Sequence, residues 1–259
     1  MKPKAIITLL TDFGETDGFV ATMKGVILSI NPDAKIIDIS HQIPAQDIEA
    51  GAFILNNCYR YFPRGTIHVA VVDPGVGSER KILAVQSNDY FFIAPDNQIL
   101  KYIFHSNETL TVVEVLNKQF FLTHISQTFQ GRDIFAPVAA HLSTGIAIDQ
   151  LGPIIEDYDH GEIDVPVVTS SSVMGKIIYA DKFGNLITNI AIELINKPIS
   201  LIEIGSTIIN RLSNSYIEVE IGQPLAIIGS SGYLEIAVRN GNARQQLSQD
   251  RGGSVIIKF

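Results

Sequence analysis

The feature that most constrains the fold is a change in hydrophobic period part-way along the chain. Over residues 1–160, short apolar runs alternate with stretches whose apolar residues recur at helical spacing. Farther on, helical spacing nearly vanishes, and short apolar runs separated by turn residues take its place. The first pattern is typical of a layered α/β domain and the second of a small β-barrel. The 259 residues are enough for two such domains.

The first domain, residues 1–160, is predicted to be an α/β layer with a largely parallel sheet. Helices are predicted over about residues 19–30, 44–62 and 132–142. Asp17 and Asp133 are the expected N-terminal caps of the first and third helices. Strands are predicted over residues 5–11, 35–40, 66–73, 81–87, 90–94 and 111–116.

The second domain, residues 173–259, is predicted to be an all-β barrel. Residues 161–172 fall in an acidic and serine-rich stretch and are the predicted linker. Strands are predicted over residues 173–180, 184–190, 200–205, 216–221, 224–229, 233–238 and 254–259.

Composition narrows the classes of function. The net charge is −8 and no cluster of Lys or Arg stands out, which argues against a nucleic-acid partner. No run of about 18 apolar residues occurs, so no membrane-spanning helix is expected. The short apolar run near the N-terminus lacks a small-residue cleavage site and is interpreted as a first strand. The single cysteine, Cys58, excludes an internal disulfide and suits a reducing cytoplasm; a core thiol is favoured over a nucleophile.

Several common catalytic motifs are absent. The sequence has no dinucleotide-binding glycine motif, no P-loop, no zinc-protease motif and no paired cysteines. The six histidines are scattered without metal-ligand spacing, so no metal site is expected. The "GSSG" of residues 229–232 lacks the spacing of a serine nucleophile and lies among barrel strands.

Acidic residues follow two of the predicted strands. Asp12 follows the first, and Asp73 follows the strand that ends in "HVAVV". After Asp73 the chain continues through Gly75 and Gly77 to Arg80. Either acid alone is explained by a turn whose backbone N–H groups it accepts. Ligands bind outside the carboxyl ends of strands in open α/β sheets, so two such acids, one beside a glycine-rich loop, predict a cleft.

Five motifs carry a resemblance to a known family. In order they read "TDFG", "DPGVGSER", "TFQGRDIFAP", "DKFGNLITN" and "SSGYLEIAVRNGNA". Together they resemble the S-adenosyl-L-methionine (SAM) hydrolases, also called SAM hydroxide adenosyltransferases, which are relatives of the fluorinase and chlorinase enzymes. The resemblance covers essentially the whole chain. It implies an α/β domain followed by a barrel, a homotrimer with each site between neighbouring subunits, and no metal or organic cofactor.

The resemblance also implies roles for single residues. Asp12 is expected to accept hydrogen bonds from both ribose hydroxyls, since a carboxylate has two oxygens. Asp181 is expected to hold the methionine ammonium, and Ser230 and Ser231 to donate to its carboxylate. The remaining expected substrate contacts, mostly to adenine, are Phe183, Asn185, Tyr216 as a stacking ring, Tyr233, Glu235 and the backbone of Val238.

The resemblance assigns Asp73, Arg80 and Gln130 to the attacking water. The hydrolases have histidine before "GRD", where this chain has Gln130. The halogenases lack the acid that stands here as Asp73, and the fluorinase has arginine in place of Ser231. The expected reaction is therefore hydrolysis of SAM to adenosine and L-methionine. A catalytically weak or silent adenosine or SAM binder is the alternative that Gln130 leaves open, and a SAM-dependent halogenase is a further one.

Overall fold

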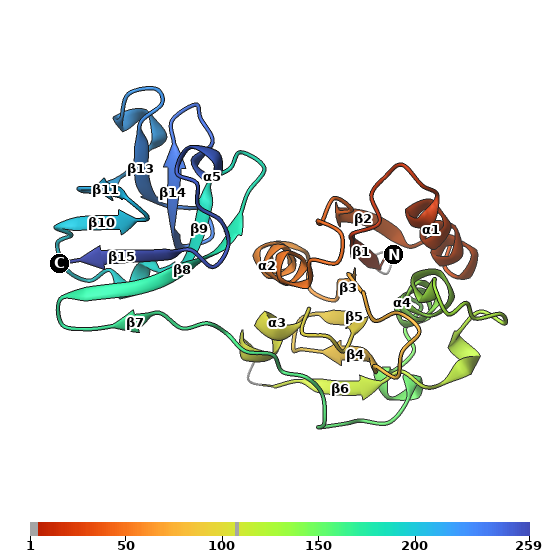
Figure 1. Cartoon of the computed structure of the whole chain (residues 1–259). Helices are drawn as coiled ribbons and strands as arrows, with labels where there is room; N and C mark the ends of the chain where they lie inside the picture. Colours follow the sequence, from red (N-terminus) through yellow and green to blue (C-terminus); the bar gives the residue numbers. More distant parts are fainter. Residues whose placement is uncertain (1–4, 107–108) are drawn as a thin grey trace. The chain divides into compact units, whose positions relative to one another are not determined.

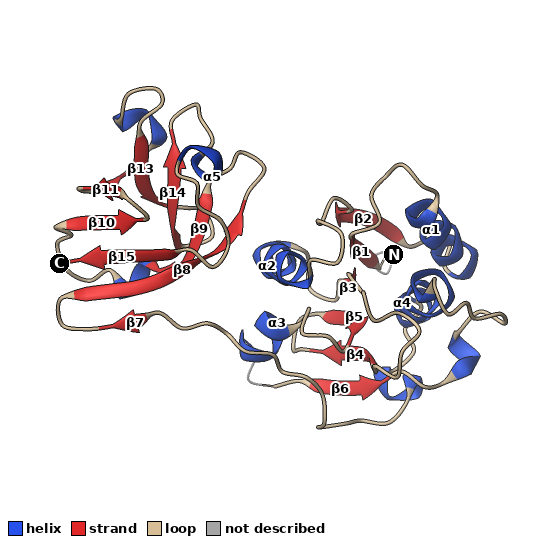
Figure 2. Ribbon diagram, in the orientation of Figure 1, coloured by secondary structure: helices blue, strands red, loops and turns tan. Residues whose placement is uncertain are grey.

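The computed structural model describes residues 5–106 and 109–259, which form two compact units divided between Ile163 and Asp164. The first unit is a mixed α/β domain and the second a barrel-like β-sheet, as the sequence predicts (Figures 1 and 2). No helix in these ranges is long and apolar enough to cross a bilayer. The predicted linker, residues 161–172, contains the two-residue strand β7 and the first residue of β8.

The first unit is built on a six-stranded sheet in the order β2-β1-β3-β5-β4-β6. Its first four strands in that order are parallel, whereas β4 runs antiparallel to both of its neighbours. The sheet is therefore largely parallel, with an antiparallel edge. The strands are β1 (Ile6–Thr11), β2 (Lys35–Ser40), β3 (Ile67–Val71), β4 (Ile82–Gln86), β5 (Phe91–Pro95) and β6 (Thr111–Glu114).

Helices cover both faces of this sheet (Figure 2). α1 (Phe19–Ile30) and α4 (Ala136–Ser143) pack on one face, and α2 (Ile48–Cys58) and α3 (Lys101–Ser106) pack together on the other. Alternate residues of each strand face opposite sides of the sheet, so a strand buried on both faces is apolar throughout. This explains why β1 and β3 are mostly apolar, and their buried polar side chains Thr8 and His68 hydrogen-bond to each other at 2.8 Å.

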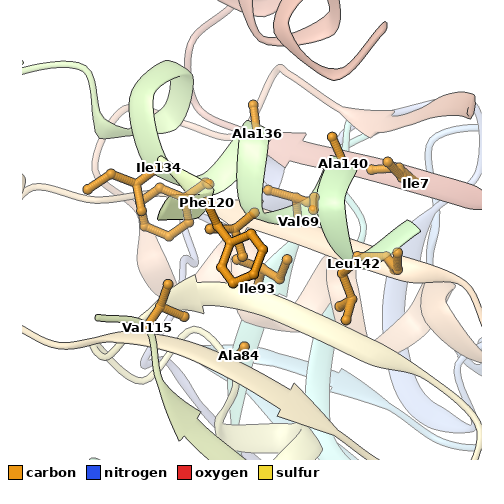
Figure 3. Packing of buried hydrophobic residues seen from close by; sticks show 14 of the residues in the cluster. Ile7, Val69, Ala84, Ile93, Val115, Phe120, Ile134, Ala136, Ala140 and Leu142 are labelled. Atoms are coloured by element: carbon orange, nitrogen blue, oxygen red, sulfur yellow. The ribbon is translucent and has the colours of Figure 1, made fainter. Parts of the chain in front are cut away.

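The core on the α1 and α4 face joins strand residues such as Ile7 and Val69 to Ala136 and Ala140 of the helix (Figure 3). Small side chains at Ala136 and Ala140 let the helix lie close to the sheet. On the other face, Gly51 lets α2 lie close to the sheet. A Cβ at this position would be only 3.2 Å from Val72 Cγ2.

Three local expectations in this unit were wrong. α1 follows Gly18, and Asp17 makes no cap bond, because it lies one residue too early. Asp133 does not cap a helix either: its carboxylate accepts from the Ser126 backbone N–H at 2.7 Å and pairs with Arg132. The predicted helix over residues 44–62 is shorter, because Asp47 caps α2 at its start and Tyr59–Tyr61 form a 3-10 turn at its end.

Short helical turns complete the first unit. A π-helical turn, Gly131–Phe135, leads directly into α4. Two more 3-10 turns are Lys118–Phe120 and Ile148–Leu151. Cys58, the last residue of α2, is half-buried, and burial raises the pKa of its thiol, which favours the core-thiol interpretation.

The second unit is a single curled sheet in the order β11-β10-β15-β8-β9-β14-β13-β12, with β7 paired to β8. β11 also contacts β13, so the sheet curls nearly to closure around one apolar core. Its strands are β7 (Val167–Val168), β8 (Ser172–Ala180), β9 (Leu186–Ala191), β10 (Leu201–Ile204), β11 (Thr207–Ile209), β12 (Leu212–Ser213), β13 (Pro224–Ile228), β14 (Tyr233–Val238) and β15 (Ser254–Lys258). Its helical turns are Ile192–Leu194, Tyr216–Glu218 and α5 (Ala243–Gln246).

The strand predicted over residues 216–221 was wrong. Tyr216–Glu218 form a 3-10 turn, and the residues after it are irregular. The alternation of apolar and acidic residues does not bury one face, since Ile217 and Ile221 are 74% and 67% exposed. The backbone carbonyl of Val219 accepts from the Arg239 guanidinium at 2.6 Å, so a side chain here satisfies it.

Candidate active site

An acid–arginine pair lies just beyond the end of β3. Arg80 Nε donates to both carboxylate oxygens of Asp73 at 2.8 Å, and its Nη2 also donates to Asp73 Oδ2. The side chain of Asp73 is only 4% exposed and that of Arg80 only 9%. A charge-assisted fork of this kind fixes the carboxylate in one orientation.

The glycine-rich loop between these two residues is required by close backbone packing. Gly77 has φ +81°, in the left-handed region that favours glycine. A Cβ at Gly77 would lie 2.5 Å from the backbone oxygen of Gln127, far inside contact distance. The loop therefore brings the segment before Gln130 against the Asp73–Arg80 pair.

Gln130 completes a trio with Asp73 and Arg80. Arg80 Nη2 lies 2.5 Å from Gln130 Oε1, and since a guanidinium only donates, the atom that faces it is the carbonyl oxygen. The side-chain nitrogen of Gln130, Nε2, makes no hydrogen bond to the described part of the chain, although the residue is only 9% exposed. Two N–H donors are thus available beside a fixed carboxylate.

Asp12 leaves the sheet beside this trio. β1 and β3 are parallel neighbours, and Thr11 pairs with Val71, so Asp12 and Asp73 emerge from the same edge. The Oδ2 atom of Asp12 accepts from the Gln46 backbone N–H at 2.8 Å. Its Oδ1 atom has no hydrogen-bond partner among the residues described, and the side chain is only partly buried.

Sequence reasoning missed an aromatic cluster that joins Asp12 to Gln130. The ring of Phe13 lies 5.9 Å from that of Phe129, and Phe19 lies 5.1 Å from Phe129, all between ring centroids. Phe13 directly follows Asp12 and Phe129 directly precedes Gln130. The sequence signal for this cluster was that each of two separate motifs has a phenylalanine next to a predicted site residue.

In the barrel unit, Asp181 organises the turn between β8 and β9. Its Oδ1 accepts from the backbone N–H groups of Phe183 and Asn185 at 2.9 and 2.8 Å, and its Oδ2 accepts from Asn185 Nδ2 at 3.0 Å. Gly184, at φ +83°, lets Asn242 approach, since a Cβ there would meet its side chain at 2.2 Å. The ring of Phe183 is 73% exposed.

Tyr216 and Glu235 form a second polar contact of the barrel. The Tyr216 hydroxyl donates to Glu235 Oε1 at 2.6 Å. Burial of Glu235 raises the pKa of its carboxyl, and the nearby charge of Asp181 raises it further, against the lowering effect of the Tyr216 hydrogen bond. Burial and the same carboxylates also raise the pKa of Tyr216. These couplings bring Asp181, Tyr216 and Glu235 into one electrostatic neighbourhood.

The other predicted barrel residues lie on the hairpin of β13 and β14. Ser230 and Ser231 occupy its turn, where the Gly229 N–H donates to the Tyr233 carbonyl at 2.9 Å. Ser230 is exposed, whereas Ser231 and Tyr233 are half-buried. Val238 ends β14 and is 4% exposed, and its backbone carbonyl accepts from the Gly241 N–H at 3.0 Å.

A pocket of about 620 Å³ opens beside the turn that Asp181 organises. Its lining is polar and comes from this turn and from the region of α5, and includes Asp181, Lys182, Asn242, Arg244 and Asp250. Among residues 5–106 and 109–259, no group of three or more His, Cys, Asp or Glu side chains is placed to hold a metal ion.

Fixed acids at the carboxyl edge of an α/β sheet, followed by a β-barrel with polar turns, define a two-domain class of small-molecule-binding protein. Two family models match the chain: the SAM hydroxide adenosyltransferase N-terminal domain over residues 7–152 and the corresponding C-terminal domain over residues 175–256. The chain therefore belongs to the SAM hydroxide adenosyltransferase family.

Similar proteins agree with this assignment. An (R)-S-adenosyl-L-methionine hydrolase of Methanocaldococcus jannaschii is 36% identical, covering 95% of this chain and 92% of its own. One of Salinispora tropica is 32% identical and covers 97% of each chain. Fluorinases are less similar, at 25–27% identity. The crystal structure of a conserved protein from Thermotoga maritima matches with a TM-score of 0.91 at 34% identity, covering 98% of this chain and 100% of that one.

Proposed function

We propose that this protein hydrolyses SAM to adenosine and L-methionine by in-line attack of water on the ribose C5′. The observation that carries the proposal is the Asp73–Arg80–Gln130 trio, which offers one fixed carboxylate and free N–H donors at the edge of the sheet. The nearly full-length similarity to hydrolases supports the same reaction.

The chemistry needs little beyond orientation. A sulfonium leaves as a neutral thioether, so no acid has to protonate the leaving group, and we propose that no metal or organic cofactor takes part. Holding water, C5′ and sulfur in line can supply on the order of 7–11 kcal/mol of the barrier. Asp73 accepts a hydrogen bond from the water and takes its proton as the C–O bond forms. Arg80 holds both Asp73 oxygens, which fixes the direction of that acceptor.

Gln130 has a different task from a histidine at the same place. Its carbonyl oxygen accepts from Arg80, and its side-chain N–H groups are the donors that it can offer to the attacking oxygen. Glutamine does not titrate, and therefore it orients the water without serving as a base. The trio then contains one proton acceptor, Asp73.

The remaining predicted residues divide the substrate among them. Asp12 accepts from the ribose diol through its free Oδ1 and its shared Oδ2. Asn185, Glu235 and the Val238 backbone contact adenine, which stacks on Tyr216, a ring that is 44% exposed. Phe183 and Tyr233 border this site. Asp181 binds the methionine ammonium, and Ser230 and Ser231 donate to its carboxylate.

We further propose a cytoplasmic homotrimer in which the α/β unit of one subunit and the barrel of the next complete each site. The proposed ligand groups fall in both units, which supports an assembly in which each unit contributes one side. The protein is expected to elute as a trimer or a multiple of one. Binding of adenosine by a monomeric species would contradict this arrangement.

The configuration at sulfur is the finer part of the proposal. The hydrolases of Salinispora tropica and Methanocaldococcus jannaschii are both named for the (R) epimer of SAM. We therefore propose that this protein prefers the same epimer, which a mixture of the two epimers tests directly by showing which one disappears first.

One experiment separates the proposed reaction from its alternatives. The protein is incubated with SAM in high chloride, and the products are separated. Adenosine and methionine support hydrolysis, whereas a chlorinated nucleoside would support a halogenase. Unchanged SAM that nevertheless binds tightly would support a silent binder, the alternative that Gln130 leaves open. The retention of Asp73 argues against halide, because a carboxylate repels an anion and accepts from water.

A further inference from the structure

The loop that carries Asp12 is tied at three points to the segment that follows β2. Thr11 Oγ1 lies 2.8 Å from His41 Nδ1. The Gly14 N–H donates to the His41 carbonyl at 2.8 Å, and the Gln46 N–H donates to Asp12 Oδ2 at 2.8 Å. Contacts therefore flank Asp12 on both sides, and two of the three converge on His41.

We call the buried Thr11–His41 contact the clamp, and the direction of its hydrogen bond follows from counting donor hydrogens. Thr11 Oγ1 accepts from the Phe13 N–H at 3.2 Å, and no other acceptor for the hydroxyl hydrogen lies among the described residues, so it is donated to His41 Nδ1. The ring proton of His41 is then on Nε2, which lies 3.1 Å from Asp38 Oδ1. That N–H is not well aligned for a hydrogen bond, so the contact is mainly electrostatic. Lys24 Nζ donates to the other Asp38 oxygen at 2.6 Å.

Neither member of the clamp can reach a ligand itself. Thr11 is 0% exposed and His41 is 3% exposed. Among residues 5–106 and 109–259, the Asp12 carboxylate has one hydrogen-bond donor, the Gln46 N–H. Gln46 itself has φ +65°, an unfavourable backbone conformation for a residue with a side chain. The direction of the carboxylate thus depends on how firmly the loop on its other side is held.

We propose that Thr11 and His41 are positioning residues that aim the Asp12 carboxylate at the ribose diol. The inference rests on the proposed ribose role of Asp12. Two hydroxyls can donate to one carboxylate only when both oxygens face them, so a rotated carboxylate loses one of the two bonds. Loosening the clamp must therefore reduce the preference for adenosine over 2′-deoxyadenosine, which offers a single hydroxyl at this edge.

The test measures the affinity of the full-length protein for both nucleosides by calorimetry. Thr11→Val removes the hydroxyl at nearly constant shape, and Thr11→Ser keeps it as the matched control. His41→Asn keeps an acceptor near the position of Nδ1, whereas His41→Gln carries its polar atoms near the position of Nε2. We expect Thr11→Val and His41→Gln to lower the adenosine preference by about three- to tenfold, and their controls to retain most of it.

The outcomes separate this inference from the function on which it rests. Equal wild-type affinity for the two nucleosides would contradict the ribose role of Asp12 and the inference with it. A wild-type preference that Thr11→Val and His41→Gln preserve would overturn the positioning role alone, even if both variants bind more weakly overall. Unfolding midpoints are recorded alongside. If Thr11→Val does not fold, the comparison of His41→Gln with His41→Asn decides the matter by itself.

Discussion

Asp73→Asn changes one oxygen of the proposed water acceptor to an amide nitrogen at nearly constant shape. Arg80 donates to both Asp73 oxygens, so the asparagine keeps one acceptor and turns an N–H₂ group toward a guanidinium. The pair is 4% and 9% exposed, and breaking a buried pair costs about 3–5 kcal/mol. The retained oxygen returns about 1–2 kcal/mol, so we expect the free energy of unfolding to fall by about 1–4 kcal/mol.

The effect on turnover is expected to be larger and of a different kind. Asp73 is the only proton acceptor of the trio, and loss of such a group typically costs 10²–10⁴-fold, so kcat should fall by at least about 10²-fold. In the proposed site adenosine contacts Asp12 and the barrel residues instead, so its Kd should change by less than about threefold, or about 0.7 kcal/mol. Adenosine release at saturating SAM, calorimetry and urea unfolding measure the three quantities.

The double variant Asp73→Asn/Arg80→Leu is the control for stability. It removes the buried charge that the single variant leaves without a counter-ion, so part of the lost stability should return while turnover stays low. Wild-type kcat in the single variant would refute the role of Asp73. Restored turnover in the double variant would show that the single variant failed through misfolding instead.

Three further predictions concern other residues. Gln130→His is expected to raise turnover by about tenfold and to add a step near pH 6.5 to the pH–rate profile, because histidine titrates there. Burial raises the pKa of Glu235, so the folded state keeps a proton that the unfolded chain releases. Wild-type stability therefore falls as the pH rises from the pKa of the unfolded chain to that of the folded state. Glu235→Gln should therefore gain stability relative to wild type, measured by urea unfolding, as the pH rises above the ordinary glutamate value of about 4.3. Gly77→Ala should destabilise by about 1–3 kcal/mol more than Gly65→Ala, since both have nearly the same φ but only the first Cβ would meet a backbone oxygen, that of Gln127.

Each of these predictions has a clear contrary result. A Gln130→His variant no faster at any pH between about 5.5 and 8.5 would mean that glutamine already suffices or lies away from the water. A constant stability difference between Glu235→Gln and wild type across pH would mean that this carboxyl titrates alike in both states. Equal losses in the two glycine variants would show that backbone strain, and not the close contact, requires Gly77.

The sequence predicted those parts of the fold that depend on local period. Apolar runs located β1 and β3, and turn residues after them located Asp12 and Asp73 at one edge. The sequence did not predict the order of the strands in the sheet. β4 lies between β5 and β6 and runs antiparallel to both, although its apolar run does not differ from that of a parallel strand. Pairing is decided by contacts between distant segments, which a periodicity does not contain.

The barrel shows where alternation misleads. Residues 216–221 alternate between apolar and acidic residues as a strand does, yet Ile217 and Ile221 are exposed. The segment begins with a 3-10 turn and pairs with none of the described strands. The three short strands β7, β11 and β12 were missed, since two or three residues are too few to establish a period. Propensity is weak evidence when the stabilising neighbours come from elsewhere in the fold.

The candidate site divides in the same way. The motifs supplied Asp73, Arg80 and Gln130, which the structure brings into contact across 50 residues of sequence. They did not supply the clamp of Thr11 and His41, because a buried threonine and a buried histidine carry no pattern of their own. Such supporting contacts become visible only once the loop after β1 and the segment after β2 are placed side by side.

The measurement that tests the central claim most directly follows the oxygen of water. The reaction is run with SAM in ¹⁸O-labelled water, and adenosine and methionine are analysed by mass spectrometry. Attack of water on C5′ predicts one ¹⁸O atom in the 5′-hydroxyl of adenosine and none in methionine. Adenosine without label, or label in methionine, would contradict attack at C5′ and with it the proposed role of the Asp73–Arg80–Gln130 trio.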